Sequence, residues 1–136
     1  MATLINSSVI IEARRGRLDL EAVAARAPDS LLAISAITAS ELLLGLHLLR
    51  DGGKKARAEA FVEAVLADLP LLPFDLLCAR AHAALGAELR RKGTMVGAHD
   101  LLIAATAIAR GFSVATCDER SFPRISGLDV ERFKTG

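Results

Sequence analysis

The sequence predicts a three-layer α/β/α sandwich built around a small, mainly parallel sheet. Short apolar runs with the length of buried strands alternate with longer helical segments along the chain. Successive strands are not joined by two-residue hairpin turn signals, which favours parallel over antiparallel pairing. The 136 residues are 52% hydrophobic but only 4% aromatic, so the core is expected to be built from Ala, Leu, Ile and Val. A chain of this length forms one domain, which we expect to span residues 1–136.

The first half of the chain alternates two expected strands with four expected helices. Helix-start residues such as Asn6 follow the strands, and glycine or proline residues stop the helices. Thr38 and Glu41 have capping-box spacing, so the third helix is expected to start with them and to continue from Leu42. The strands are predicted over Thr3–Ile5 and Leu31–Ile34, and the helices over Val9–Arg15, Leu18–Ala27, Leu42–Arg50 and Lys54–Leu69.

The second half continues the alternation of strands and helices. Gly93 and Gly111 follow two apolar helical segments at the positions where helices commonly end. Strands are predicted over Pro70–Pro73, Phe112–Thr116 and Leu128–Phe133, the last at a sheet edge, and helices over Asp75–Lys92 and Leu101–Arg110.

Four polar side chains are expected to meet at one edge of this sheet: Asn6, Glu41, Asp100 and Asp118. Each follows a strand or opens a helix, and in a parallel sheet strand carboxyl ends and helix N-termini share one edge. Carboxylates gathered there repel one another, and hard oxygen ligands suit Mg²⁺ or Mn²⁺. Such an ion activates water for phosphodiester hydrolysis without a nucleophilic side chain.

Each of these residues also has an ordinary structural explanation. Glu41 fits the capping box, and Asp100 is favourable beside a helix N-terminus because of the helix dipole. Asn6 and Asp118 are good capping or turn residues. His99 has no second histidine at metal-ligand spacing and is interpreted as a local polar residue. The residues alone therefore leave a metal-dependent nuclease and a purely structural role equally open.

Other features narrow the function further. The net charge of +1 gives no overall attraction to nucleic acid, so any such binding must be local. Arg14, Arg15 and Arg17 lie nearest in sequence to the expected edge and are the candidates for contacts with substrate phosphates.

Cys78 and Cys117 lack the spacing of a zinc site or disulfide scaffold. The GxSxG, P-loop and GxGxxG motifs do not occur.

The apolar runs of the chain are all shorter than a membrane span. Charged residues interrupt each run before it reaches the length of a transmembrane helix. The N-terminus lacks the basic start and long apolar run of a signal peptide. We therefore expect a cytoplasmic protein with no membrane partner.

Four segments resemble the PIN-domain ribonucleases in their order and spacing, and most of all the VapC toxins of bacterial toxin–antitoxin pairs. The segments are NSSVIIEARRG, ITASELLLGLHLLR, HDLLIAATAIARG and VATCDERSF. The resemblance implies a magnesium-dependent endoribonuclease that is inhibited by a VapB-like antitoxin and forms homodimers or toxin–antitoxin hetero-oligomers. It places the metal-binding acids on Glu41, Asp100 and Asp118, with Thr116 as a supporting hydroxyl. The helices over Leu42–Arg50 and Lys54–Leu69 are the expected clamp for an antitoxin segment.

Position 6 departs from the family pattern, because Asn6 stands where the first family motif has aspartate. An amide can still offer a carbonyl oxygen, but the site loses one negative charge facing the metal. Three hypotheses follow: a toxin ribonuclease weakened by Asn6, a non-catalytic PIN module that binds antitoxin or RNA, and a DNA nuclease on the same fold. An otherwise intact motif set is compatible with either an engineered or a natural substitution.

Overall fold

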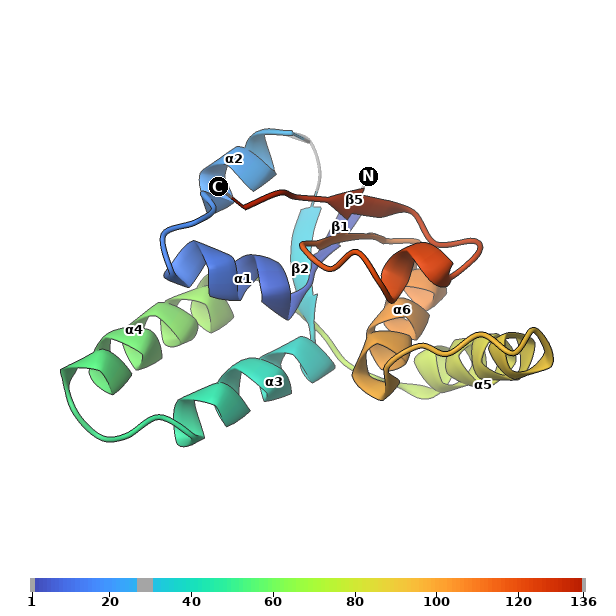
Figure 1. Ribbon diagram of the computed structural model, residues 1–136, viewed down its shortest axis with the longest axis horizontal. Coiled ribbons are helices and arrows are strands. Elements are labelled where there is room, and N and C mark those ends of the chain that lie inside the picture. The colour runs from blue at the N-terminus through green and yellow to red at the C-terminus, as the bar shows by residue number, and fades with distance from the viewer. Residues whose placement is uncertain (1, 27–30, 136) are drawn as a thin grey trace.

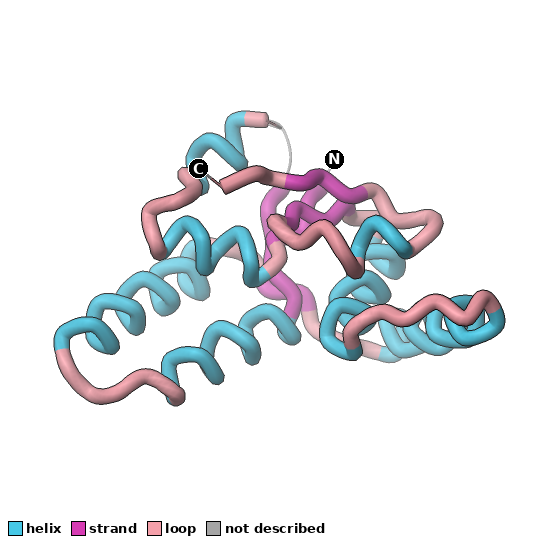
Figure 2. Tube along the Cα trace, in the orientation of Figure 1, coloured by secondary structure: helices cyan, strands magenta, loops and turns pink. Residues whose placement is uncertain are grey.

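The computed structural model describes residues 2–26 and 31–135, and it confirms the predicted sandwich. Five parallel strands form one sheet in the order β3-β2-β1-β4-β5. Helices α1 to α4 lie on one side of the sheet and α5 and α6 on the other (Figure 1). The strands therefore form the middle layer, as Figure 2 shows.

The element bounds follow the predicted order, with small shifts at most ends. The strands are β1 (Ala2–Ile5), β2 (Leu31–Ser35), β3 (Leu71–Leu72), β4 (Ser113–Thr116) and β5 (Val130–Arg132). The helices are α1 (Ser7–Arg14), α2 (Leu20–Ala25), α3 (Ala36–His47), α4 (Gly53–Asp68), α5 (Leu76–Arg91) and α6 (Ala98–Arg110). A short 3₁₀ turn at Phe122–Arg124, which contains Pro123, was not expected.

Alternation of side chains along the strands divides the core in two. In β1, Leu4 packs with the α5 and α6 side, whereas Ile5 packs with the α1 to α4 side. The same alternation separates Val114 from Ala115 in β4. Because successive strand residues point to opposite faces, each apolar run supplies both cores. The central strands β1, β2 and β4 are consequently buried on both faces up to their carboxyl ends.

The predicted start of α3 is wrong. The helix begins at Ala36, because Ser35 at the end of β2 is its N-cap and its Oγ accepts a hydrogen bond from the Thr38 N–H at 3.0 Å. Thr38 is therefore a buried first-turn residue, and the predicted capping box with Glu41 does not form. Glu41 lies in the second turn, where its carboxylate is free for other contacts.

Other predicted boundaries move by one to three residues. Helix α6 begins at Ala98, so Asp100 lies within its first turn instead of preceding it. Gly111 ends this helix in the left-handed region (φ 71°), as predicted. The predicted end of the second helix at Ala27 and the turn at 28–30 lie outside the described residues. Within the described ranges, no helix combines the length and apolar character that a membrane span requires.

Candidate functional site

The candidate site lies at the carboxyl ends of the neighbouring strands β1 and β4. Asn6 follows β1 directly, and its backbone N–H donates to the Ala115 carbonyl of β4 at 2.9 Å. Asn6 also caps α1, and Asp118 lies two residues beyond the end of β4. Parallel pairing of β1 with β4 thus delivers both polar residues to the same edge.

The side-chain oxygen of Asn6 accepts hydrogen bonds from three donors. Oδ1 lies 3.2 Å from the Ser8 backbone nitrogen, 2.7 Å from Ser8 Oγ and 3.3 Å from Thr116 Oγ1. Asn6 is only 4% exposed, and Thr116 is fully buried. The end of β1, the start of α1 and the end of β4 are therefore joined through one oxygen atom.

Two backbone donors fix the direction of this network. The Cys117 N–H donates to Ser8 Oγ at 2.9 Å, and the Asp118 N–H donates to Thr116 Oγ1 at 3.0 Å. Each hydroxyl has a single proton, and with a lone pair occupied by a backbone donor it can direct that proton to an acceptor. Both hydroxyls lie within hydrogen-bond distance of Asn6 Oδ1, which has no proton of its own.

Glu41 reaches the same edge from α3. Its Oε1 accepts a hydrogen bond from Ser7 Oγ at 3.2 Å, and its Oε2 lies 3.5 Å from His99 Nδ1. Ser7 is the first residue of α1 and His99 is in the first turn of α6. The Glu41 carboxylate therefore contacts the N-terminal turns of both helices.

Asp100 lies in the first turn of α6, where the helix dipole favours a negative charge. The residue before this helix, Gly97, makes no side-chain cap. A Cβ atom at Gly97 would lie 3.3 Å from Asp100 Oδ2 and 4.0 Å from Ser121 Oγ. The glycine thus leaves space for the Asp100 carboxylate beside the loop that follows β4.

Asp118 is held in a local turn. Its Oδ1 accepts a hydrogen bond from the Arg120 backbone N–H at 2.8 Å. Between Thr116 and Asp118 lies the free thiol of Cys117, whose pKa is raised by burial and by the nearby negative charge of Glu12. The loop after β4 therefore presents the Asp118 carboxylate next to a protonated thiol.

The three arginines proposed for phosphate contacts do not reach this edge. Arg14 is the last residue of α1, and Arg15 and Arg17 follow it. Arg15 and Arg17 instead face Glu12, with nitrogen–oxygen distances of 3.8 and 3.6 Å. An eight-residue helix is roughly 12 Å long, so these side chains start from the opposite end of α1 to Asn6.

The three carboxylates are suitable ligands for a hard divalent cation, but the Asn6 amide is not. Glu41, Asp100 and Asp118 supply carboxylate oxygens of the kind that Mg²⁺ takes. Among the described residues, however, no three His, Cys, Asp or Glu side chains come close enough to form a metal-binding group. The oxygen of Asn6 already accepts from three donors. The acids therefore fit the ion by type, whereas the amide at position 6 offers it no free oxygen.

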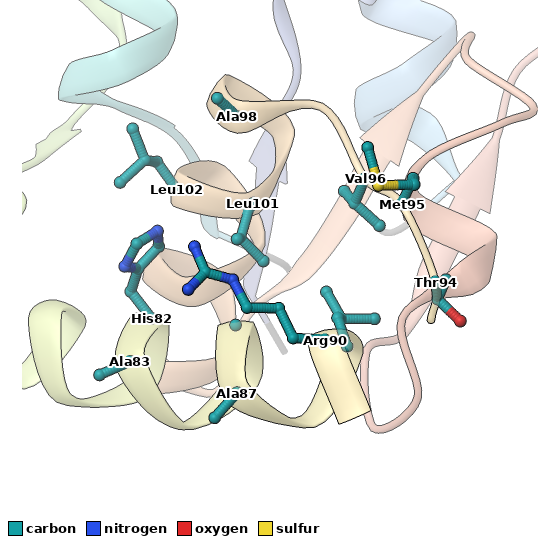
Figure 3. A pocket seen from close by; sticks show the side chains of 12 residues that line it. His82, Ala83, Ala87, Arg90, Thr94, Met95, Val96, Ala98, Leu101 and Leu102 are labelled. Carbon is teal, nitrogen blue, oxygen red and sulfur yellow. The ribbon is translucent and has the colours of Figure 1, made fainter. Parts of the chain in front are cut away.

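A separate hollow of about 760 Å³ lies between α5, the loop after it and the start of α6 (Figure 3). Its walls are mainly apolar and include Leu101 and Leu102 of α6, with Arg90 and His82 from α5 (Figure 3). No carboxylate is among its lining residues. We therefore place the candidate chemistry at the sheet edge that carries Glu41, Asp100 and Asp118, called the acidic edge below, and not in this hollow.

Sequence reasoning missed three residues that organise the site, Ser7, Ser8 and Gly97, and it interpreted a fourth, His99, only as a local polar residue. Ser7 and His99 hold Glu41, Ser8 links Asn6 to the β4 end, and Gly97 makes room for Asp100. The only signal in the sequence is the pair of serines directly after Asn6 at a helix start. The contacts of His99 and Gly97 depend on how α3, α6 and the β4 loop pack together.

Comparisons with known proteins find relatives that match most of the chain. The family model described as PIN domain matches residues 3–128. The ribonuclease VapC1 of Rickettsia felis is 33% identical over 130 residues, covering 96% of this chain and 95% of that protein. The tRNA(fMet)-specific endonuclease VapC of Salmonella typhimurium is 38% identical over 102 residues, covering 75% of each.

Solved structures give the same result. The VapBC2 complex of Rickettsia felis, solved with a DNA fragment from its promoter, matches with a TM-score of 0.87 and 27% identity. That match covers 98% of this chain and 99% of the other. The FitAcB structure from Neisseria gonorrhoeae matches with a TM-score of 0.80 and 33% identity, covering 94% of this chain and 95% of the other.

Proposed function

Because the chain belongs to the PIN-domain family, and within it to the VapC-type ribonucleases, we propose that its acidic edge hydrolyses RNA phosphodiester bonds as the toxin of a toxin–antitoxin pair. Nucleases of this family generally depend on a divalent metal ion. The proposed ion is Mg²⁺ or Mn²⁺, and its proposed ligands are Glu41, Asp100 and Asp118, joined by the residue at position 6 when that residue is aspartate. The protein would act in the cytoplasm, where its RNA substrate is found.

One observation carries the proposal: two sets of polar contacts meet at the consecutive residues Asn6 and Ser7, one linking Asn6 to Thr116 of β4, the other linking Ser7 to Glu41 of α3. Ser7 and His99 orient Glu41, and the Asp118 N–H is anchored on Thr116. The alternative explanation of Glu41 as a capping-box residue is removed, because α3 is capped by Ser35. A carboxylate that is not needed for a cap and is held by two other helices supports a chemical role.

The proposed roles follow from these contacts. When bound, a divalent ion supplies positive charge that polarises the phosphodiester and makes water a better nucleophile. Glu41 and Asp100 would hold the ion, with Glu41 kept in place by Ser7 and Asp100 accommodated by Gly97. Asp118 contributes a further carboxylate, and Thr116 supports it through the backbone. Arg14, Arg15 and Arg17, at the far end of α1, would contact a phosphate away from the cleaved bond.

Cleavage assays in the Asn6→Asp form test this function. RNA and DNA oligonucleotides of identical sequence are incubated with Mg²⁺ or with EDTA. The proposal requires cleavage of RNA that depends on Mg²⁺, with DNA left intact. Equal cleavage of DNA would support the DNA nuclease instead. If neither the RNA nor the DNA oligonucleotide is cut while RNA or an antitoxin still binds, the result would support the non-catalytic module. Asn6 itself favours that alternative.

We also propose a VapB-like antitoxin as partner, seated against α4. A hollow of about 280 Å³ lies between α2, α4 and the sheet, and its mainly apolar lining would suit an apolar segment. Its lining comprises Ile5, Leu20, Val23, Leu32, Phe61, Ala64, Val65, Asp68 and Leu69. The expected clamp combined the third and fourth helices, but α3 supplies none of these residues. The proposed groove is therefore formed by α2 and α4.

A second copy of the chain is the other proposed partner. Large apolar side chains are exposed at Leu44 of α3, at Leu48 just after it, and at Leu76 and Leu77 at the start of α5. Monomeric proteins rarely expose large contiguous apolar patches, and such patches commonly mark protein–protein contacts. Light scattering of the purified toxin would give a dimer mass under this proposal and a monomer mass without it.

A further inference from the structure

We infer that the hydrogen-bond network around position 6 turns the NH₂ group of Asn6, and not its oxygen, toward the acidic edge. Asn6 therefore opposes divalent-metal binding instead of serving as a weak ligand. The inference rests on the proposed metal-dependent function and goes beyond it, because it assigns Ser8 and Thr116 as positioning residues that decide which atom of residue 6 faces the metal.

The amide orientation follows from a donor that cannot change its character. The Ser8 backbone N–H lies 3.2 Å from the Asn6 side-chain atom at the helix start. A backbone N–H can only donate, so the atom that it meets has to be the oxygen. Turning the amide over would set an NH₂ group against this N–H.

The two hydroxyls are placed to support the same orientation. Ser8 Oγ and Thr116 Oγ1 each receive a backbone N–H, from Cys117 and Asp118, and each lies within 3.3 Å of Asn6 Oδ1. Their protons are thus available for the Asn6 oxygen. A reversed amide could still donate to the second lone pair of Ser8 Oγ, so the Ser8 backbone N–H, which can only donate, decides the orientation.

The Asn6 NH₂ group is then left on the open side of the residue. Among the hydrogen bonds of the described residues, Nδ2 donates to none, and it is not among the buried polar atoms that lack a partner. It therefore keeps access to solvent. The adjacent Ser7 holds the Glu41 carboxylate. A donor with partial positive charge faces the place where a cation would have to approach.

The same network explains what aspartate would do at this position. One carboxylate oxygen would take the place of Oδ1 and accept from Ser8 and Thr116. The second oxygen would replace Nδ2 and face the acidic edge as an anionic ligand. The network is therefore suited to a carboxylate, and asparagine converts the metal-facing atom from an acceptor into a donor while preserving every internal hydrogen bond.

Mn²⁺ titration by calorimetry tests this inference with three forms: the chain as written, Asn6→Asp and Asn6→Ser. Serine keeps a helix-capping oxygen but removes the NH₂ group and leaves room for water. We expect affinity to fall from Asp to Ser to Asn, with the Asn form at least about tenfold weaker than the Asp form, since disturbing even an outer partner of a metal ligand typically costs that much. Tighter binding by Asn than by Ser would overturn the inference, because the amide oxygen would then be a ligand.

Two further results separate this inference from the proposed function. If the Asp form binds no Mn²⁺, the acids are not a metal site and both proposals fail together. If the Asp form binds but the Asn form equals it, the metal site stands and only the inference fails. Nuclear magnetic resonance gives an independent reading of the chain as written. A strong Overhauser effect between the Asn6 side-chain NH₂ and the Ser8 amide proton would show the reversed orientation and overturn the inference.

Discussion

Ser7 and Ser8 are adjacent in sequence, yet their hydroxyls act on different parts of the site. Ser7 points to Glu41 on α3, and Ser8 points to Asn6 and the end of β4. This division follows from the start of α1, where consecutive side chains project about 100° apart. Small hydroxyl side chains thus fix carboxylate and amide orientations without adding bulk to the acidic edge.

Asp100 gives a direct test of a catalytic role. In the Asn6→Asp form, Asp100→Ala should abolish RNA cleavage while changing the free energy of unfolding by under about 1 kcal/mol, since a helix-start acid contributes no more than that. Urea unfolding and cleavage would be measured on the same preparations. Asp51→Ala, at a fully exposed acid in the turn before α4, is the control and should retain activity. Normal cleavage by the Asp100→Ala protein would show that Asp100 has no catalytic role and only stabilises the start of the helix.

Gly97 tests how closely the Asp100 carboxylate must be placed. In the Asn6→Asp form, Gly97→Ala brings a methyl group 3.3 Å from Asp100 Oδ2 and should slow cleavage, by roughly three- to tenfold for a shift of a few tenths of an ångström. The matched control is Gly86→Ala on α5, whose methyl group makes an ordinary 3.9 Å contact with Leu101. Equal rates for the two variants would show that Gly97 has no role in the site.

The order of the elements could be predicted from sequence because it depends on local signals. Apolar runs, Gly93 and Gly111 marked the strands and helix ends that the structure contains. The start of α3 could not be predicted, because Ser35 and Thr38 both favour capping and only the end of β2 decides between them. Similarly, the four positions at the edge could be predicted from strand and helix order. The roles of Ser8 and His99 could not, since they arise from packing between distant elements.

Asp75 links two helices, because it caps α5 through the Cys78 N–H and pairs with Arg110 of α6. The hydrogen bond from Cys78, assisted by the Arg110 guanidinium, lowers the pKa of the Asp75 carboxyl from its usual 3.8. A lowered pKa means that the charged form stabilises the fold above pH 3.8, and that this stabilisation is lost as the pH falls through the lowered value.

Replacement of this carboxylate should reveal the pH dependence. Asp75→Asn keeps a good cap but removes the charge. We expect the melting temperature of the variant to lie below that of the parent at pH 7, and the difference to shrink once the pH falls below 3.8. Because both proteins share all other titratable groups, the effect of those groups on the melting temperature cancels in the difference at each pH. A difference that is absent at neutral pH, or that grows in acid, would contradict this account.

In the molecule as a whole, the acidic edge and the α2–α4 groove draw on different parts of the scaffold. The edge is built from strand ends and helix starts, whereas the groove is lined from the face of the sheet that α2 and α4 cover. Ile5 contributes to the groove, and the next residue, Asn6, belongs to the edge. A partner segment in the groove could therefore extend to the acidic edge over a short distance.

Two alanines on α4 allow the groove to be tested. Ala64 and Ala60 are both exposed, but only Ala64 lines the hollow. Ala64→Glu should weaken antitoxin binding by at least about tenfold, because it places an unpaired charge in an apolar groove. Ala60→Glu should bind normally, and both variants should retain cleavage in the Asn6→Asp background. Binding would be measured by calorimetry with the cognate antitoxin, and equal affinities would exclude this groove as the docking surface.

The central claim is that a metal-dependent ribonuclease site is assembled at the acidic edge and that the side chain at position 6 decides whether it works. The most direct measurement is the single-turnover rate of RNA cleavage in Mg²⁺ by the chain as written and by Asn6→Asp, with circular dichroism and melting temperature recorded for both. Asparagine and aspartate cap helices about equally well, so the folds should match. The account requires cleavage by the Asp form and a rate at least about a hundredfold lower for the Asn form, consistent with loss of a group that acts in the transition state. Equal Mg²⁺-dependent rates for the two forms would contradict it.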